Sequence, residues 1–402
     1  MNSVYYINLN EREDRKILIE KELSKIFDNF IRIPAENGMN YTNNSKISSM
    51  VGCALSHIKA LKQGLIDDNE NIFIFEDDFQ IEIDVHKTKN LINNLTNLDY
   101  NIILLSYHIP MVKINNIRNN IADVSNGQTT CGYVIKKSYI PTLILTFEES
   151  IKNLINSVNL DLHSLDQFWK KLQTPENKFY CSIPRIGKQR DDYSDIVKNN
   201  VSYGGSCFMG LLSCEKYKSK RSLQDLSNSI FEYKYFIGNP ELKSAEVIDD
   251  IVYLPCGDNY EDLSYKTYLM VDWIINHYPH INYIFKTDDD INFDFEKLME
   301  IYSNISLNNY QYCGNLVTPS PHESVYHYGK CFDKSKETPI NVESFSYCSG
   351  GGYFISKKSA ELVVRDMNTY SNIFEDYSVG KVLLKNNIQQ ININIHNNAC
   401  FL

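Results

Sequence analysis

Tyr283-Ile284-Phe285-Lys286-Thr287-Asp288-Asp289-Asp290 is an apolar run that ends in three adjacent carboxylates. Its aromatic and β-branched residues predict a strand inside a sheet, where ionised side chains are costly to bury. We therefore expect the three aspartates at the carboxyl end of the strand, in the crevice where open α/β sheets bind ligands. Because like charges this close repel, a hard divalent cation with oxygen ligands is expected to neutralise them.

An earlier segment repeats this pattern. Ile72-Phe73-Ile74-Phe75 is also an apolar run, and Glu76-Asp77-Asp78 follow it directly. A simpler interpretation of Asp288 to Asp290 is that they only cap the helix predicted from Phe293 to Ile305. The repetition favours two sheets, each with its own ligand crevice.

Length and composition limit the possible functions. A chain of 402 residues predicts two to three domains, and 43% hydrophobic with 22% charged residues is an ordinary globular composition. The formal net charge of −10 argues against a nucleic-acid partner, which would need an excess of Lys and Arg. If an acidic protein binds an anionic phosphate donor, a cation is expected between its carboxylates and the phosphates, because the like charges repel.

The ten cysteines contain no CxxC pair, so no zinc site is predicted from their spacing. The N-terminus enters a strand pattern without a basic leader, and no stretch of about 18 apolar residues occurs. These features predict a chain without a signal peptide or membrane span, cytoplasmic, with reduced thiols. The abundance of Tyr, Asn and Ile is compatible with an AT-rich viral or bacterial genome.

The first half begins with a strand predicted at Val4 to Leu9 and a helix predicted from Arg12 to Phe30. Asn8 and Arg15 flank the turn between them, where a nucleotide would bind in an α/β fold. The alternative for the arginine is a solvated charge on the helix face.

A second helix is predicted from Ser48 to Ile66 and carries the small-residue run Gly52-Cys53-Ala54-Leu55-Ser56-His57. His57 is either a structural histidine or a ligand-binding one. A short helix is predicted to start at Leu165. Within it, Asp166 is either the N-cap or a base on the acceptor side.

These N-terminal motifs resemble glycosyltransferase family 25, which includes lipopolysaccharide glycosyltransferases and collagen hydroxylysine galactosyltransferases. The resemblance covers about residues 3–200, and the matching residues are Val4 to Arg15, Gly52 to His57, Phe75 to Asp78 and Gln189 to Asp195. The predicted roles are donor binding for Asn8, Arg15, His57 and Glu76, metal binding for Asp78, and catalysis for Asp166. Met50 departs from the family, which usually has Glu two residues before the Gly of the Gly-Cys motif.

The two halves are expected to meet near Val201 to Ser206, where Gly204 and Gly205 precede a new strand, Cys207 to Ser213. Further strands are predicted at Tyr233 to Gly238 and Ile248 to Leu254, followed by a helix from Leu263 to Tyr278. This alternation predicts a mostly parallel sheet with helices on both faces. The expected domains are 1–200 and 207–402, joined by a linker at 201–206.

Three glycines, Gly350 to Gly352, are predicted to precede a strand, where they would permit positive φ and let backbone amides approach a ligand. A flexible loop is the alternative. Phe374 to Gly380 places acids at the start of a helix, and His396 follows the strand-like Ile391 to Ile395.

The second half resembles glycosyltransferase family 31, the β-1,3-galactosyl-, N-acetylglucosaminyl- and Fringe-type transferases. The matching residues, which span about residues 206–400, are Tyr235 to Gly238, Asp258 to Thr267, Lys286 to Asp290, Tyr347 to Tyr353 and Glu375 to Gly380. The resemblance implies inverting, metal-dependent transfer on a nucleotide-diphospho-sugar fold. The implied roles are metal binding for Asp290 and His396, donor binding for Asp288, Asp289 and Gly351, and catalytic base for Asp376.

The sequence thus predicts two tandem Rossmann-like domains of the GT-A type. The favoured function is a bifunctional hexosyltransferase that uses UDP-sugars and Mn²⁺ or Mg²⁺, with a glycan, glycoprotein or collagen-like acceptor. In the alternative, only the C-terminal half is catalytic and the N-terminal half is an acceptor-binding or scaffolding module, as the Met50 departure suggests. A metal-dependent phosphate-ester hydrolase is the third possibility.

Overall fold

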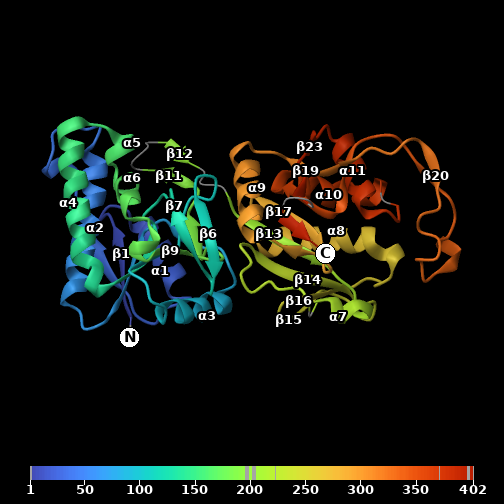
Figure 1. Cartoon of the computed structure of the whole chain (residues 1–402), viewed down its shortest axis with the longest axis horizontal. Coiled ribbons are helices and arrows are strands. Elements are labelled where there is room, and N and C mark those ends of the chain that lie inside the picture. Colours follow the sequence, from blue (N-terminus) through green and yellow to red (C-terminus); the bar gives the residue numbers. More distant parts are fainter. Residues whose placement is uncertain are drawn as a thin grey trace. The chain divides into compact units, whose positions relative to one another are not determined.

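The computed structural model describes residues 2–194, 199–201, 205–221, 223–370, 372–395 and 399–401. The chain divides into two compact units, Met1–Gly204 and Gly205–Leu402. Each unit has its own large mixed sheet with helices packed on it (Figure 1). No helix in these described ranges is both long enough and apolar enough to cross a lipid bilayer.

The first unit is built on an eight-stranded sheet in the order β2-β1-β3-β8-β5-β9-β7-β6. β1 pairs in parallel with β2 and β3, whereas β8 is antiparallel to β3 and β5. The strands are β1 Asn2–Asn8, β2 Ile31–Pro34, β3 Asn71–Glu76, β5 Ile102–Leu104, β6 Lys113–Arg118, β7 Ile121–Ser125, β8 Gly132–Lys136 and β9 Phe179–Ser182. Two small ladders pair β4 Phe79–Ile81 with β10 Gly187–Gln189 and β11 Asp192–Ser194 with β12 Asn199–Val201.

Both faces of β3 are buried, which explains why its acids come at its end. Phe73 and Phe75 pack in the core that includes Ile19 of α1 and Ile92 of α3. On the other face, Gly64 of α2 lies close to Ile72. A strand covered on both sides has room for carboxylates only where it leaves the sheet.

The helices of the first unit cover these two faces. α2 packs against α4 (Figure 1). The helices are α1 Glu13–Leu23, α2 Ser48–Ile66, α3 Val85–Thr96, α4 Ile140–Ser157, α5 Leu160–His163 and α6 Leu165–Phe168.

The helix predicted at Ser48 to Ile66 has these bounds, but the helix predicted to reach Phe30 ends at Leu23. Beyond that point, the backbone amides of Ile26 and Phe27 both donate to the Leu23 carbonyl. This turn keeps Ile26 in the core without continuing the helix.

The second unit contains another eight-stranded sheet, in the order β15-β16-β14-β13-β17-β22-β19-β23. β13, β14, β16 and β17 are parallel to one another, and β22 is antiparallel to both β17 and β19. The strands are β13 Cys207–Leu212, β14 Glu232–Gly238, β15 Glu246–Ile248, β16 Ile251–Leu254, β17 Tyr283–Asp288, β19 Tyr312–Val317, β22 Tyr347–Ser356 and β23 Gln390–Asn392. Short ladders pair β18 Asn292–Phe293 with β24 Cys400–Phe401 and β20 His322–Ser324 with β21 Ile340–Val342.

The helices of the second unit include three that pack on one another, α8, α10 and α11. Their bounds, with those of the other helices, are α7 Lys218–Arg221, α8 Leu263–His277, α9 Phe295–Leu307, α10 Lys357–Tyr370 and α11 Glu375–Lys385. The N-cap of α9 is Asp294, whose side chain accepts from the amide of Lys297, so Asp288 to Asp290 do not cap this helix.

The prediction of one strand from Ile248 to Leu254 is wrong for its first three residues, because β16 begins only at Ile251. The structure forms an antiparallel hairpin there, β15 to β16, with Asp249 at φ 53° in the turn. A non-glycine residue in the left-handed region interrupts an extended strand, and Asp tolerates this conformation better than most residues.

Two glycines hold the start of α2 close to the preceding chain. A Cβ added at Gly52 would lie 2.6 Å from the carbonyl oxygen of Glu36 and 2.9 Å from the amide nitrogen of Gly38. Both neighbours are backbone atoms that cannot rotate away. Any larger residue at position 52 must therefore push apart two segments of the chain.

We expect Gly52→Ala to lower the stability of the first unit by about 1–3 kcal/mol, the usual cost of overpacking. Gly64→Ala on the same helix should cost less, because its added methyl meets side-chain atoms of Ile72 and Ile140 and no backbone atom. Trp169 and Trp273 are the two tryptophans and lie in different units. Urea titration followed by ¹⁹F NMR of 5-fluorotryptophan therefore reports each unit separately, and an unchanged Trp169 midpoint in Gly52→Ala would contradict the close-approach argument.

Candidate active sites

The residues predicted to act in the first unit come together around one cavity of about 680 Å³. It lies at the carboxyl ends of β1 and β3. The predicted residues that line it are Asn8, Arg15, His57, Glu76, Asp78 and Asp166. The structure therefore brings these six positions together, and their individual roles remain predictions.

Asp77 organises the donor-side residues, a role that the sequence did not assign to it. Its carboxylate accepts a hydrogen bond from Asn8 Nδ2 at 2.8 Å and from Arg15 Nη1 at 3.3 Å. The other amide atom of Asn8, Oδ1, accepts from Arg32 Nε at 2.9 Å. Burial raises the pKa of Asp77, and the contacts with Asn8 and Arg15 oppose that rise. The pair of Asn8 and Arg15 is thus fixed in place at the cavity wall.

The Asp78 carboxylate lies close to two other acids, Glu76 and Asp77. Its partners are Gln189 Nε2 and Cys131 Sγ, both at 3.2 Å, with Arg15 Nη1 at 3.9 Å. Burial, together with the charges of Glu76 and Asp77, raises the pKa of Asp78 to about 7. A cluster of carboxylate oxygens that lacks enough cationic partners is a donor set that fits Mn²⁺ or Mg²⁺.

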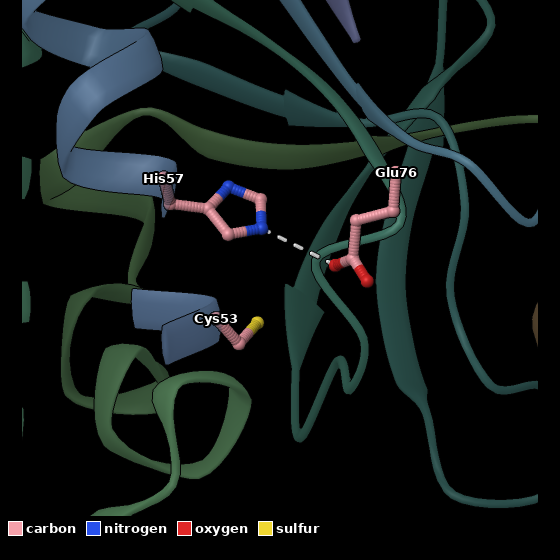
Figure 2. A group of neighbouring side chains, drawn as sticks. All are labelled: Cys53, His57 and Glu76. Carbon is pink, nitrogen blue, oxygen red and sulfur yellow. Dashed lines mark hydrogen bonds and ion pairs between the residues drawn. The ribbon is translucent and has the colours of Figure 1, made fainter. Parts of the chain in front are cut away.

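Glu76 and His57 form a hydrogen-bonded pair (Figure 2). Glu76 Oε1 lies 3.2 Å from His57 Nε2 and accepts a hydrogen bond from Thr130 Oγ1 at 2.6 Å. The other ring nitrogen, Nδ1, lies 3.1 Å from the hydroxyl of Tyr133. Although burial works against ionisation, the hydrogen bond with His57 keeps the pKa of Glu76 below its ordinary value.

Asp166 lies at the opposite wall of the cavity and is not the N-cap that the sequence suggested. α6 begins at Leu165 as predicted, so the N-cap position falls to Ser164, and Asp166 lies in the first turn of the helix. The Asp166 carboxylate instead accepts a hydrogen bond from the amide of Thr129 at 3.4 Å. Burial raises the pKa of this carboxyl, which is the direction that favours a general acid or base near neutral pH.

Sequence reasoning missed Thr130, and it named Gln189 and Cys53 only as parts of the family 25 motifs, without roles of their own. Thr130 and Gln189 contact the acids, and Cys53 lies beside His57. The Cys53 and His57 side chains share one helix face because they are four residues apart, a signal that was present in the sequence. Thr130 and Gln189 come from distant segments, and only the folded chain shows them at this cavity.

In the second unit, the buried Lys286 links the end of β17 to the start of α11. Its ammonium lies 3.0 Å from Asp288 Oδ1 and 3.1 Å from Glu375 Oε2, and it also donates to the carbonyl of Gly350. Burial alone would lower the pKa of Lys286, but the two carboxylates outweigh it and raise the pKa. The lysine therefore stays charged and neutralises two acids at the edge of the sheet.

Glu375 is the most deeply buried acid of this group, with 7% of its surface exposed. Tyr353 donates its hydroxyl to Glu375 Oε1 at 2.5 Å. Burial raises the pKa of Glu375 to about 7, although Lys286 acts in the opposite direction.

The three aspartates at the end of β17 differ in burial. Asp288 is half-buried and Asp290 is exposed. Asp289 is buried and accepts a hydrogen bond from Ser213 Oγ at 2.5 Å. The oxygen donors of Asp288 and Asp290 fit a hard divalent cation. His396, the predicted second protein ligand, lies outside the described residues.

Asp376 lies in the first turn of α11 and faces β22. Its Oδ2 accepts a hydrogen bond from the amide of Gly350 at 3.0 Å. The adjacent Glu375 side chain occupies the same side of Gly350, because a Cβ added there would lie 3.2 Å from Glu375 Oε2. The glycine is thus needed for the close approach of β22 to these acids.

The prediction that Gly350 to Gly352 precede a strand is wrong, because they lie inside β22. None of the three has a positive φ. The carbonyl of Gly351 accepts a hydrogen bond from Thr287 Oγ1 at 2.9 Å, which ties β22 to β17. These glycines therefore do not serve a left-handed backbone conformation, and a Cβ added at Gly352 would meet Phe285 only in ordinary van der Waals contact at 3.4 Å.

The motif Asp258 to Thr267 leads from β16 into α8 and contacts the end of β14. Asp258 Oδ1 accepts from Lys266 Nζ at 2.6 Å and from the amide of Gly238 at 2.8 Å. Lys266 also donates to the backbone carbonyl of Ser213 at 2.9 Å, and the side-chain hydroxyl of the same Ser213 donates to Asp289. These contacts fix the strand ends that carry the site.

The titration of Glu375 should make the stability of the second unit depend on pH. Because its folded pKa of about 7 exceeds the ordinary 4.5, the folded unit binds the proton more tightly. This contribution is fully present below pH 4.5 and is lost as pH rises through 7, a change of about 3 kcal/mol at about 1.4 kcal/mol per unit.

Urea titration at pH 5 and pH 8, followed at fluorinated Trp273, measures this dependence. Glu375→Gln should flatten it, whereas Glu343→Gln, which removes an exposed acid from the same unit, should not. Equal pH dependence in the parent and in Glu375→Gln would rule out the titration of this carboxyl as the cause.

Comparison with known families agrees with the division of the chain. Residues 1–163 match the model of glycosyltransferase family 25 (LPS biosynthesis protein), and residues 240–394 match the galactosyltransferase model. The tandem order of a family 25 region and a family 31-type galactosyltransferase region, predicted from the motifs, is confirmed.

Individual relatives match the C-terminal region. UDP-GalNAc:beta-1,3-N-acetylgalactosaminyltransferase 1 is 28% identical over 151 residues in Homo sapiens and 30% identical over 154 residues in Mus musculus, in each case 36% of this chain and 43% of the relative. Beta-1,3-galactosyltransferase bre-2 of Caenorhabditis elegans is 28% identical over 132 residues, 31% of this chain and 35% of the relative. The chain thus spans less than half the length of these curated relatives.

Proposed function

We propose that this chain, in which a glycosyltransferase family 25 region precedes a galactosyltransferase region, is a bifunctional, metal-dependent hexosyltransferase. Each unit takes a UDP-sugar and transfers the sugar to a glycan, glycoprotein or collagen-like acceptor, and the C-terminal unit inverts the anomeric centre. The observation that carries the proposal is that both units place carboxylates at the end of a fully buried central strand, β3 or β17, with a further acid nearby.

In the second unit, Asp376 is the proposed base. Its carboxylate is oriented by two backbone amides, that of Gly350 at Oδ2 (3.0 Å) and that of Tyr377 at Oδ1 (2.8 Å). A carboxylate oxygen can accept more than one hydrogen bond, so the group can still take a proton from the attacking hydroxyl. Asp290, with His396 as the proposed second ligand, would hold Mn²⁺ or Mg²⁺, and Asp288 binds the donor. When bound, the ion supplies Lewis-acid stabilisation of the charge that develops on the leaving diphosphate.

Lys286 has a positioning role in this proposal. It holds Asp288 and Glu375 at a fixed separation and keeps their charges from repelling a diphosphate. Glu375, in turn, lies next to Asp376 in the first turn of α11 and is anchored to β22 through Tyr353. The base and the donor side are therefore linked through the buried groups Lys286, Glu375 and Tyr353.

In the first unit, Asn8 and Arg15 bind the donor, Asp78 holds the metal and Asp166 acts as the base. Met50 lines the cavity at the position where the family usually has Glu. Glu36 lines the same cavity from a different segment and is paired with Lys59 at 2.7 Å. The retained acids support catalysis in this unit, whereas Met50 is what favours the alternative of an acceptor-binding module.

We expect Asp376→Asn to keep donor binding but to lose transfer by the second unit about 10²–10⁴-fold, because only the base is removed. Asp290→Ala should instead lose metal-dependent donor binding. Sugar transfer and free UDP are measured on the intact chain with a panel of UDP-sugars, with and without Mn²⁺, and donor binding is measured by equilibrium dialysis of labelled UDP.

Asp166→Asn is the matched change in the first unit. If the chain is bifunctional, Asp166→Asn and Asp376→Asn abolish different transfer products. A chain in which Asp166→Asn changes no product has an inactive first unit, and parent rates in both Asp376→Asn and Asp290→Ala would refute the assignment of the second site. Release of sugar to water at a rate that acceptors do not increase would indicate a hydrolase instead.

A further inference from the structure

We propose that Cys53, His57 and Glu76 form a binding site for a thiophilic divalent cation, best matched by Zn²⁺, in the cavity of the first unit. A thiol sulfur, a ring nitrogen and a carboxylate oxygen of these residues all lie within 4.8 Å of one another (Figure 2). This site is distinct from the carboxylate sites proposed for Mn²⁺, because it contains sulfur and nitrogen ligands. The proposal does not depend on the proposed sugar transfer, because it concerns only the binding of a cation.

Two rigid elements position the three groups. Cys53 and His57 are four residues apart on α2, so both side chains project from one helix face. Glu76 is the last residue of β3 and reaches the same point from the sheet. Ligands on regular elements are held more precisely than ligands on loops.

The ring of His57 is already oriented as a metal ligand. Nδ1 lies 3.1 Å from the buried hydroxyl of Tyr133, and Nε2 points at Glu76 Oε1 at 3.2 Å (Figure 2). A histidine that binds a metal through one nitrogen commonly donates the other N–H to such an outer partner. Nε2 and Glu76 Oε1 form a hydrogen-bonded pair, and a cation bound between the three groups would replace that hydrogen bond.

Glu76 is held by a second contact that does not compete with a cation. Thr130 donates its hydroxyl to Glu76 Oε1 at 2.6 Å, while Oε2 remains for coordination or for a further partner. Cys53 is half-buried and lines the cavity, as do His57 and Glu76. A cation at the cluster would therefore be reached from the cavity.

The ligand types select the cation. Thiolate, imidazole and carboxylate together suit Zn²⁺, whereas Mn²⁺ and Mg²⁺ prefer oxygen ligands alone. Tetrahedral Zn²⁺ would separate its ligand atoms by about 3.3–3.6 Å, so the groups need shifts on the order of 1 Å. Three protein ligands leave a fourth position for water or a substrate oxygen from the cavity, the arrangement of an open zinc site.

Cobalt titration of the full-length chain under reducing conditions tests the proposal. Co²⁺ bound to a thiolate gives a sulfur-to-metal absorption band that oxygen-only sites cannot give. We expect one equivalent of Co²⁺ to produce the band, and Zn²⁺ to abolish it by displacement. Because the carboxylate sites contain no sulfur, this readout is independent of whether the chain transfers sugar.

Variants separate this cluster from the other thiols. Cys53→Ser should lose the band, whereas Cys214→Ser, which removes a half-buried thiol from the second unit, should keep it. Tyr133→Phe should keep the band and weaken Co²⁺ binding about 10–100-fold, as expected for the loss of the partner that orients His57. Fluorinated Trp169 reports whether each variant keeps the fold of the first unit.

The absence of the band in the parent chain would overturn the proposal. A band that persists in a folded Cys53→Ser variant would also overturn it, because another thiol would then be the ligand.

Discussion

The cost of placing charge at the end of a buried strand is the constraint on which both units depend. Ionised carboxylates need water or partners, and the strands β3 and β17 are covered on both faces. In the second unit, Lys286 meets this need by contacting Asp288 and Glu375, and it is itself buried. Removal of that ammonium would leave two acids without their cation, so the geometry of β17, β22 and α11 depends on it.

The first unit meets the same constraint in a different way. Arg15 comes from the helix after β1 and contacts Asp77 and Asp78, and Asn8 supplies an amide to Asp77. Glu76 is instead paired with His57. Arg15, Asn8 and His57 offset the acids only in part, as the raised pKa of Asp78 shows. This leaves an anionic cavity whose remaining charge suits a cation.

Much of this architecture could be predicted from local patterns. The acid-tipped strands, the helix at Ser48 to Ile66 and the acids at the start of α11 follow from apolar periodicity and from the abrupt change to charged residues. Periodicity does not report where a chain turns back. It therefore missed the left-handed Asp249 that divides β15 from β16.

The sequence predicted which residues form the sites better than it predicted which partners those residues contact. Adjacent acids were expected to act together. Instead, Asp289 accepts a hydrogen bond from Ser213, and Asp77 accepts hydrogen bonds from Asn8 and Arg15. The glycines of β22 were expected to precede a strand and to permit positive φ, but they lie inside the strand, and Gly350 approaches Glu375 closely. These contacts depend on which distant segments the fold brings together. A pattern within one segment does not predict which other segment it will contact.

The central claim is that each acid-tipped strand helps a divalent cation to hold the diphosphate of a sugar donor. Calorimetric titration of the intact chain with UDP tests it most directly, with saturating Mn²⁺ in one sample and with the metal chelated in the other. The account predicts two equivalents of UDP per chain with Mn²⁺ and a large loss of affinity without it. One equivalent or none, or binding that survives chelation unchanged, would contradict the account.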